Sequence, residues 1–372
     1  MAHQTIPVIQ RNTNGIIQVL LLILLALLFS QCEDDKPRTD DGTIPPPDFE
    51  VDSTRTDLDR STRPFRTSYD GQIIDTHVHL DPPEDGIDTS ALREIIQVIE
   101  DANVSFAIFM PTPNDGRNDN HEEGATQRET LFNLDHGKVK LFCCSNYTTY
   151  WLDQAYRDRY TESELDTILL RLSSDFDVGN IAGAGEIGLY HFNKTGSQPV
   201  IEYPPNFEPF LSIVDIISEK DTWLDLHAEP VDPDGVSYEK EVFGGLALLF
   251  ERYPNLKLIL SHTAMTNPNN VRSILRTYQT VMMNIKIKTN HDKWKNLEPV
   301  VNTEGELYED WAELFEEMPE RFMIGTDSKF GRSSFETSDY LTQIEEERAI
   351  LGSIDSDAAS KIAYENAANI FE

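Results

Sequence analysis

The stretch Ile73-Ile74-Asp75-Thr76-His77-Val78-His79 is a short apolar run that ends in two histidines. Seven more apolar runs follow it along the chain, and each is nearly continuous rather than alternating with polar residues. Runs of this kind are typical of parallel strands that are covered on both faces. The eight predicted strands contain residues 73–74, 106–110, 139–143, 181–184, 224–226, 256–260, 281–283 and 322–324.

Amphipathic patterns lie between several of these runs. Leu92, Ile95 and Ile99 recur at helical spacing, and so do Trp311 and Leu314. Eight strands with helical connections predict an α/β protein, a (β/α)8 TIM barrel, over residues 71–372. A doubly wound sheet is the alternative.

Composition narrows the class of protein. The 372 residues carry 31 Lys and Arg against 65 Asp and Glu, and this net charge of −34 argues against nucleic acid as a partner because it repels phosphates. Three cysteines are too few for a disulfide scaffold, so burial must stabilise the core. Cys143 and Cys144 are adjacent on a predicted strand, and we expect them to face opposite sides and to pack in the core.

Residues 1–31 are expected to form a signal peptide. An apolar run from Ile16 to Phe29, shorter than the ~20 residues that span a bilayer, follows Arg11. It ends directly before Cys32, an arrangement that resembles the lipobox of bacterial lipoproteins and implies lipidation of Cys32. An ordinary signal peptide or an uncleaved anchor is the alternative, and every version places the remaining chain outside the cytoplasm.

The segment 32–70 is acidic and proline-rich, with few apolar side chains. Such a segment buries too little surface to offset its ordering entropy, so we expect a disordered tether. The predicted location is the bacterial envelope, anchored through lipid at the outer membrane or the cell surface.

Residues able to bind a metal follow five of the predicted strands. His77 and His79 are two residues apart, so they share a face of the first strand at ~6.6 Å. The other candidates are Glu186, His227, His262 and Asp327, at the ends of the fourth, fifth, sixth and eighth strands. All strand ends of a barrel meet on one rim, which brings this N,O set together. The set suits one or two divalent ions, Zn²⁺ ahead of Mn²⁺, whereas a scaffold role explains one such residue better than six in register.

This ordered set resembles the amidohydrolase superfamily of metal-dependent hydrolases. There, H-x-H follows strand one, a carboxylate or carbamylated lysine follows strand four, histidines follow strands five and six, and an aspartate follows strand eight. The resemblance implies that His77 and His79 bind the deeper of two metals and that Glu186 bridges both. It implies further that His227 and His262 bind the outer metal.

Asp327 is the catalytic residue that the resemblance implies. It would contact the deeper metal, accept the proton of the attacking water and deliver it to the leaving group. The metal would lower the pKa of that water to ~7. The alternatives are a loop cap for Asp327 and a buried ion-pair partner for Glu186.

Short motifs of this chain resemble two different groups within the superfamily. Gly185-Glu186-Ile187-Gly188-Leu189 is similar to TatD-type deoxyribonucleases, but those tend to carry a basic residue after the strand-five histidine, where this chain reads His227-Ala228-Glu229. Gly325-Thr326-Asp327 equally resembles the amidohydrolase-related group, which includes lactonases and carboxylate-lyases. A bridging Glu186 favours hydrolysis, since the lyases generally use one metal.

Four residues are weaker candidates for substrate contacts: Tyr190, His191, Lys286 and Lys329. Lys286 shares a strand face with Asn284, and a lysine there would bind a carboxylate or phosphate of the substrate. Simple exposure to solvent is the alternative for Lys286, and we favour it slightly.

The sequence therefore predicts a metal-dependent hydrolase of a small ester, lactone, amide or phosphoester, tethered to a membrane by a lipid. Alternatives are a mononuclear carboxylate-lyase, a TatD-like nuclease and, from another class, a non-catalytic surface-tethered binding protein.

Overall fold

The computed structural model describes residues 60–83, 86–113, 121–192, 200–287, 298–332 and 335–372. The predicted signal peptide, Cys32 and residues 32–59 of the predicted tether lie outside these ranges. Within them, no helix has the length and apolar character needed to cross a membrane.

Eight parallel strands form a closed barrel, which confirms the predicted (β/α)8 fold. Each pairs with the next along the chain, and the last pairs with the first through Ile324 and Asp75. Every predicted apolar run coincides with one of these strands, and only the run 256–260 begins a residue earlier than its strand. They are β1 (Ile73–Leu80), β2 (Val104–Met110), β3 (Val139–Cys144), β4 (Ile181–His191), β6 (Trp223–Ala228), β7 (Lys257–Leu260), β8 (Val281–Ile285) and β9 (Phe322–Ile324).

Two short strands extend this sheet. β5 (Ile201–Glu202) pairs antiparallel with the end of β4. β10 (Ser328–Phe330) pairs parallel with β1, just beyond the point where β9 does. β9 and β10 therefore occupy one strand position of the barrel, and residues 325–327 interrupt it.

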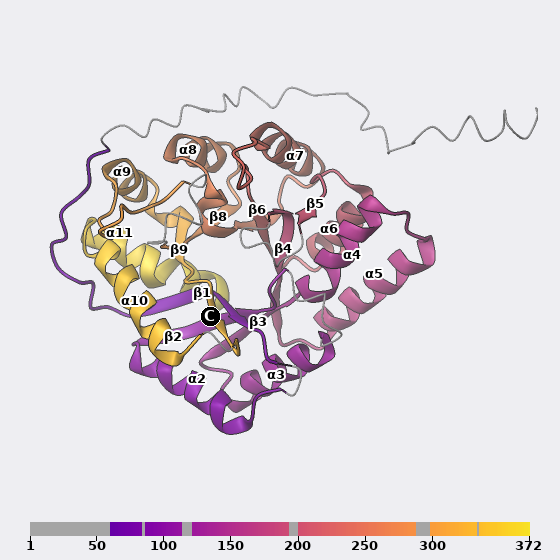
Figure 1. The fold of residues 1–372 in the computed structure, drawn as a ribbon, viewed down its shortest axis with the longest axis horizontal. Coiled ribbons are helices and arrows are strands. Elements are labelled where there is room, and N and C mark those ends of the chain that lie inside the picture. The colour runs from indigo at the N-terminus through magenta and orange to yellow at the C-terminus, as the bar shows by residue number, and fades with distance from the viewer. Residues whose placement is uncertain (1–59, 84–85, 114–120, 193–199, 288–297, 333–334) are drawn as a thin grey trace, which may run out of the picture. The chain divides into compact units, whose positions relative to one another are not determined.

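Helices surround the strands in the ribbon view (Figure 1). The predicted helical patterns are confirmed in α2 and α9, where Leu92, Ile95, Trp311 and Leu314 are buried. The helices are α2 (Thr89–Asp101), α3 (His121–Leu134), α4 (Ser145–Arg157), α5 (Glu162–Asp177), α6 (Glu208–Glu219), α7 (Glu239–Arg252), α8 (Pro268–Thr277), α9 (Glu309–Glu317), α10 (Thr337–Leu351), α11 (Ser356–Ser360) and α12 (Asn366–Phe371). Short helical turns are η2 (Ser261–Met265), η3 (Pro319–Arg321) and η4 (Lys361–Glu365).

The core has two layers because side chains alternate along each strand. On β2, Phe106 and Ile108 belong to a small cluster inside the barrel, whereas Phe109 belongs to the large cluster between strands and helices. The C-terminal helix α12 closes the inner cluster, where the Phe371 ring lies 5.8 Å from that of Phe142. The C mark accordingly lies among the strands in Figure 1.

Residues 60–70, assigned from composition to the tether, lie against the barrel's helices (the indigo segment in Figure 1). Arg63 forms ion pairs with Glu309 at 2.9 Å and with Glu316 at 2.5 Å. The guanidinium of Arg60 pairs with Asp310 and lies 4.0 Å from the centre of the Tyr308 ring. Residues 60–70 thus pack on the barrel, although its predicted start was residue 71.

The cysteine prediction was wrong in one respect. Cys143 and Cys144 are buried, as expected, but a disulfide joins them. Cys144 has a φ of 86°, so the strand's alternation ends there and the two side chains lie on the same side.

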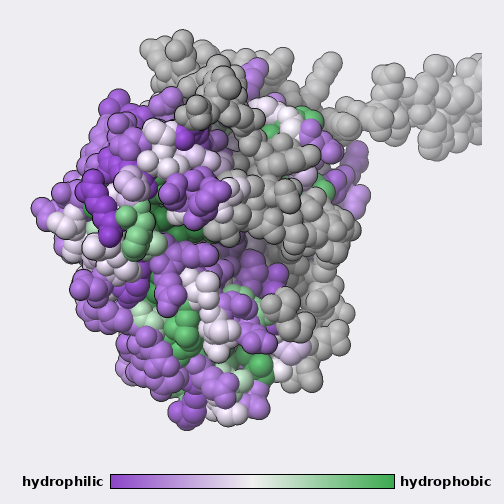
Figure 2. Space-filling view, turned by 60° about the vertical axis from the view of Figure 1, so that its left-hand side comes forward, coloured by the Kyte–Doolittle hydropathy of each residue, from purple (hydrophilic) through white to green (hydrophobic). Residues whose placement is uncertain are grey.

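The surface is mainly hydrophilic, as the acidic composition requires. Figure 2 shows hydrophobic areas scattered between hydrophilic ones on the face it presents. Five large apolar side chains of the described residues are exposed, and apart from Leu170 and Val178 of α5 and its C-cap they come from separate segments of the chain: Phe65, Leu170, Val178, Val200 and Val236. No single apolar patch therefore dominates the described surface.

Candidate metal centre at the carboxyl ends of the strands

β1 places two histidines side by side inside the barrel mouth. His77 and His79 are fully buried, and their Nε2 atoms lie 3.2 Å apart. The Nδ1 atom of His79 lies 3.3 Å from the carbonyl oxygen of Met110 on β2. The sharing of one strand face, predicted from the H-x-H spacing, is therefore observed.

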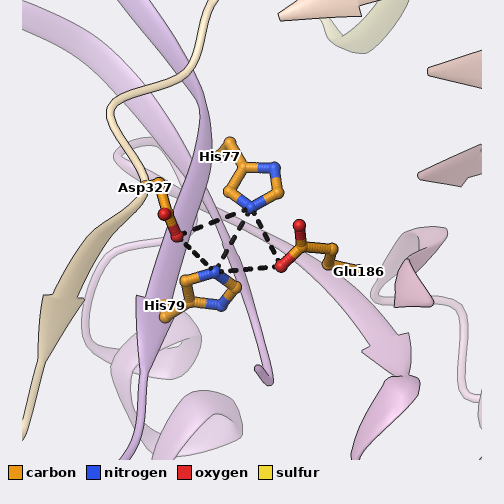
Figure 3. A group of neighbouring side chains, drawn as sticks. All are labelled: His77, His79, Glu186 and Asp327. Carbon is orange, nitrogen blue, oxygen red and sulfur yellow. Dashed lines mark hydrogen bonds and ion pairs between the residues drawn. The ribbon is translucent and has the colours of Figure 1, made fainter. Parts of the chain in front are cut away.

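Glu186 of β4 lies between two pairs of histidines. Its Oε2 atom is 3.5 Å from Nε2 of His77 and 3.4 Å from Nε2 of His79 (Figure 3). Its Oε1 atom is 2.5 Å from Nδ1 of His227 and 3.2 Å from Nε2 of His262. Each carboxylate oxygen thus faces a different pair of imidazoles.

Asp327 completes the first of these groups. It lies in the interruption between β9 and β10 with a φ of 56°, and its backbone N–H donates to the carbonyl of His77 at 2.8 Å. This geometry directs Oδ1 to within 2.9 Å of Nε2 of His79 (Figure 3). The preceding Thr326 fixes the segment through a 2.7 Å hydrogen bond from its hydroxyl to Asp75.

His262 reaches the site from an unusual turn. Residues 262–265 have φ angles of 57°, 54°, 53° and 49°, although none is glycine. The backbone N–H of His262 donates to Oδ1 of Asn284 at 2.7 Å, and this bond ties the turn to β8. The strand-end location of His262 was predicted, but the left-handed turn was not.

A second set of buried side chains supports these histidines. Nδ1 of His77 lies 3.1 Å from Nδ2 of Asn284 and 3.4 Å from Oδ2 of Asp225. Ser261 donates to the other oxygen of Asp225. Hydrogen bonds to the far ring nitrogen fix the orientation and tautomer of a ligating histidine.

Glu229 has the same role for His227. Its Oε1 atom lies 2.8 Å from Nε2 of His227, so Nδ1 is the nitrogen that faces Glu186. Asp225 and Glu229 were not predicted as site residues. They precede and follow His227 at a spacing of two in an otherwise apolar strand, a signal that was present in the sequence.

One glycine is required by close packing at the site. A Cβ on Gly325 would lie 2.7 Å from Cβ of Asn284 and 2.9 Å from Cβ of His77. Any larger residue there would displace the side chains that hold β1 and β8 together.

The protonation states of His79 and His262 suit metal ligands. Burial, followed by the charge of Lys329, lowers the pKa of His79 to about 3. Burial and the charge of Lys286 hold the pKa of His262 well below its usual value. Both imidazoles are therefore neutral at pH 7, as ligation requires.

Charged neighbours shift the pKa values of His77 and Glu186 in favour of their charged forms. Burial alone would lower the pKa of His77, but the charges of Glu186 and Asp225 outweigh it and raise that pKa to about 9. Burial opposes ionisation of Glu186, yet the neighbouring His227 and His77 hold its pKa well below the usual range. Glu186 is thus a carboxylate, with acceptor lone pairs on both sides.

The donor set fits divalent cations. One ligand atom from each of His77, His79, Glu186 and Asp327 lies within 4.8 Å of the others, and the same holds for Glu186, His227 and His262. Glu186 belongs to both groups. Imidazole nitrogens with carboxylate oxygens form a combination that Zn²⁺ and Mn²⁺ accept. A cation bound at His77 would have to displace the proton that this imidazole carries at pH 7.

The weaker candidates divide into two kinds. Lys286 and Lys329 both contact the carboxylate of Asp327, and the His191 ring lies 4.7 Å from that of His227. The slightly favoured interpretation of Lys286 as a solvated side chain was wrong, because this side chain is only 12% exposed. Among the described residues, the Tyr190 ring packs against Phe192 and Tyr238 rather than against the six ligand candidates.

Comparison with known proteins gives matches in structure at low sequence identity to this chain. No protein-family model and no curated protein sequence matches it. Among solved structures, it is similar to a Lactobacillus casei protein described as a metal-dependent hydrolase, with 10% identity and a TM-score of 0.48 over 81% of this chain and 95% of that one.

Two further solved structures are similar to the same degree. A dihydroorotase from Campylobacter jejuni has 15% identity and a TM-score of 0.45, over 80% of this chain and 82% of that one. An aminofutalosine deaminase from Helicobacter pylori has 10% identity and a TM-score of 0.42, over 78% and 72%. All three TM-scores are below 0.5. The assignment of the fold therefore depends on the observed strand pairing, and the assignment of a function depends on the geometry of the site.

Proposed function

We propose that this chain is a metal-dependent hydrolase of the amidohydrolase type, acting on a small ester, lactone, amide or phosphoester. One observation carries the proposal. The two oxygens of Glu186 face two different pairs of histidines, within 2.5–3.5 Å. A carboxylate in that position would help to hold two divalent cations, and the chemistry of the donors suits Zn²⁺ or Mn²⁺.

The geometry divides the ligands into two sets, one for each cation. His77 and His79, on the Oε2 side of Glu186, would hold one cation, and His227 and His262, on the Oε1 side, the other. Divalent cations supply electrophilic polarisation of the scissile bond and acidify water. Asp225 and Glu229, hydrogen-bonded to the far ring nitrogens, would keep the imidazoles in the ligating orientation.

Asp327 is the proposed catalytic base. Its Oδ1 lies 2.9 Å from Nε2 of His79, at the inner edge of the barrel mouth. From there it would take a proton from the attacking water and return it to the leaving group. Proton transfer through a single carboxylate suits the hydrolysis of an ester, a lactone, an amide or a phosphoester.

Elemental analysis of the purified chain, prepared without chelator, tests the proposal. About two equivalents of zinc or manganese, together with turnover of lactone, ester or phosphodiester substrates, is the expected result. About one equivalent with carbon dioxide release would support a mononuclear lyase, and nicking of single-stranded DNA would support a nuclease. A chain that takes up no metal even on reconstitution would be a binding protein instead.

We also propose that the enzyme is exported and anchored to the bacterial envelope through lipid on Cys32. The apolar run that ends directly at this cysteine supports the proposal. Mass spectrometry of the mature N-terminus, with Cys32→Ser as the comparison, tests it. An unmodified Cys32 in membrane-associated protein would refute it.

A further inference from the structure

Two lysines approach the proposed catalytic base from strands on either side of it. Lys286 follows β8 and contacts Oδ2 of Asp327. Lys329 lies on β10, with Nζ 2.8 Å from Oδ1 of Asp327. Each oxygen of this one carboxylate therefore has its own ammonium group.

The strands direct both side chains to the barrel mouth. Lys286 lies two residues after Asn284, whose side chain contacts His77 inside the barrel, so both share the inward face. Lys329 is in register with His79 on the neighbouring strand, while the next residue, Phe330, packs outward. The two lysines thus enter the mouth beside the proposed ligands.

Two ammonium groups at one point are notable in a chain this acidic. Two lysines converge on the Asp327 carboxylate in a chain with 65 acidic residues and only 31 Lys and Arg residues. Their side chains are 12% and 32% exposed, so solvent reaches them at the mouth. Both ammonium groups therefore lie beside the proposed catalytic base, where a bound substrate would have to be placed.

We propose that Lys286 and Lys329 bind an oxyanion, a carboxylate or phosphoryl group, that the substrate carries beside its scissile bond. This inference rests on the proposed function and narrows it, because neutral esters and amides would lack the group that the lysines bind. Ammonium groups bind such oxyanions through charge-assisted hydrogen bonds.

Calorimetric titration of the metal-loaded chain tests this without any substitution. The probes are malonate, inorganic phosphate and malonamide, the neutral analogue of malonate. Malonate or phosphate should bind at least tenfold more tightly than malonamide, and the tighter of the two identifies the chemical class. Equal affinity for malonate and malonamide would overturn the inference.

Substitutions then locate the binding. Lys286→Met and Lys329→Met should each weaken binding of the preferred anion by about tenfold or more, the loss typical of one hydrogen bond to a charged group. Lys257→Met is the matched control, because Lys257 is similarly exposed, pairs with Asp221 at 2.8 Å and lies at the opposite end of its strand. Its removal should leave the anion affinity unchanged.

Metal content measured on the same samples separates the two inferences. A wild-type chain without metal overturns the proposed hydrolase, whereas normal metal content with anion affinity unchanged in both lysine variants overturns only the anion site. If either variant fails to fold, Lys286→Gln or Lys329→Gln, which keeps a polar side chain of similar length, takes its place in the same titration, because malonate could also bind the metal directly in the wild-type chain.

Discussion

Replacing Glu186 with glutamine tests the shared carboxylate directly. The change preserves the size of the side chain but exchanges one charged oxygen for an amide NH₂. Glutamine keeps a single acceptor oxygen, so it can face either His77 and His79 or His227 and His262, but not both pairs. We therefore expect one cation to be lost and the other to bind more weakly.

The magnitude follows from burial. Glu186 is 2% exposed, and removal of one partner from a buried charged pair costs about 3–5 kcal/mol. At about 1.4 kcal/mol for each tenfold change, the more weakly held cation should lose about 10²- to 10⁴-fold in affinity. The amide NH₂ of glutamine would point at the imidazole nitrogens of one pair, so the side chain could not regain a ligand for the cation on that side.

The assay is metal stoichiometry after dialysis against a series of buffered free-metal concentrations. Glu229→Gln is the matched control, because Glu229 is equally buried and touches His227 but belongs to neither group that contains Glu186. Glu229→Gln should lower the metal affinity by only about 10- to 100-fold, as for other residues that orient a ligand. Two cations held by Glu186→Gln with wild-type affinity would refute the bridging role.

Three other predictions follow from the same geometry. Asp327→Asn should retain most of the metal but lower kcat by about 10²- to 10⁴-fold, and unchanged turnover would remove Asp327 from the mechanism. Gly325→Ala should destabilise the chain by about 1–3 kcal/mol in urea unfolding, because the new Cβ would lie 2.7 Å from Cβ of Asn284. The control Gly244→Ala in α7 adds a Cβ that meets no atom within 4 Å, so it should stabilise the chain by up to about 1 kcal/mol. Equal effects of the two substitutions on the free energy of unfolding would contradict this reasoning. Burial raises the pKa of Glu347 well above its ordinary value, so stability falls as pH rises above about 4.3, where the unfolded chain loses this proton and the folded chain still holds it. Glu347→Gln should therefore be more stable than wild type at pH 8 and equal to it near pH 4, and a difference independent of pH would show that the charge is not the cause.

The barrel was predictable because its strands are buried on both faces. A run such as 106–110 must be apolar at every position, since Phe106 faces the barrel interior and Phe109 faces the helices. The burial of the strands on both faces also made the six ligand candidates recognisable in the sequence. Polar residues at the end of an apolar strand can only lie at the rim, and the structure brings these six together there.

Contacts between distant residues could not be predicted from local composition. Arg63 and Glu316 are separated by 253 residues in sequence, yet they hold the segment before β1 against α9. Composition alone assigned that segment to a tether. The pairing of Lys286 with Asp327 was missed for the same reason, because it depends on how two strands lie beside each other.

The conformation of 262–265 was also beyond sequence reasoning. Thr263, Ala264 and Met265 have no particular preference for positive φ, so no residue type marks the turn. The bond from His262 to Asn284 and the packing around it select this conformation. Tertiary contacts decide the backbone here, and they also decide where the imidazole points.

That turn has a consequence for how the molecule fluctuates. A left-handed conformation costs non-glycine residues about 1–2 kcal/mol each, so the four consecutive residues together hold on the order of 4–8 kcal/mol. This amount is comparable to the net stability of an entire domain, about 5–15 kcal/mol. Partial opening between β7 and β8 would release it, so the amide hydrogens of 262–265 should exchange with solvent at a lower free energy than those of the strands beside them. The histidine that this turn carries is therefore positioned only as long as the barrel around it stays closed.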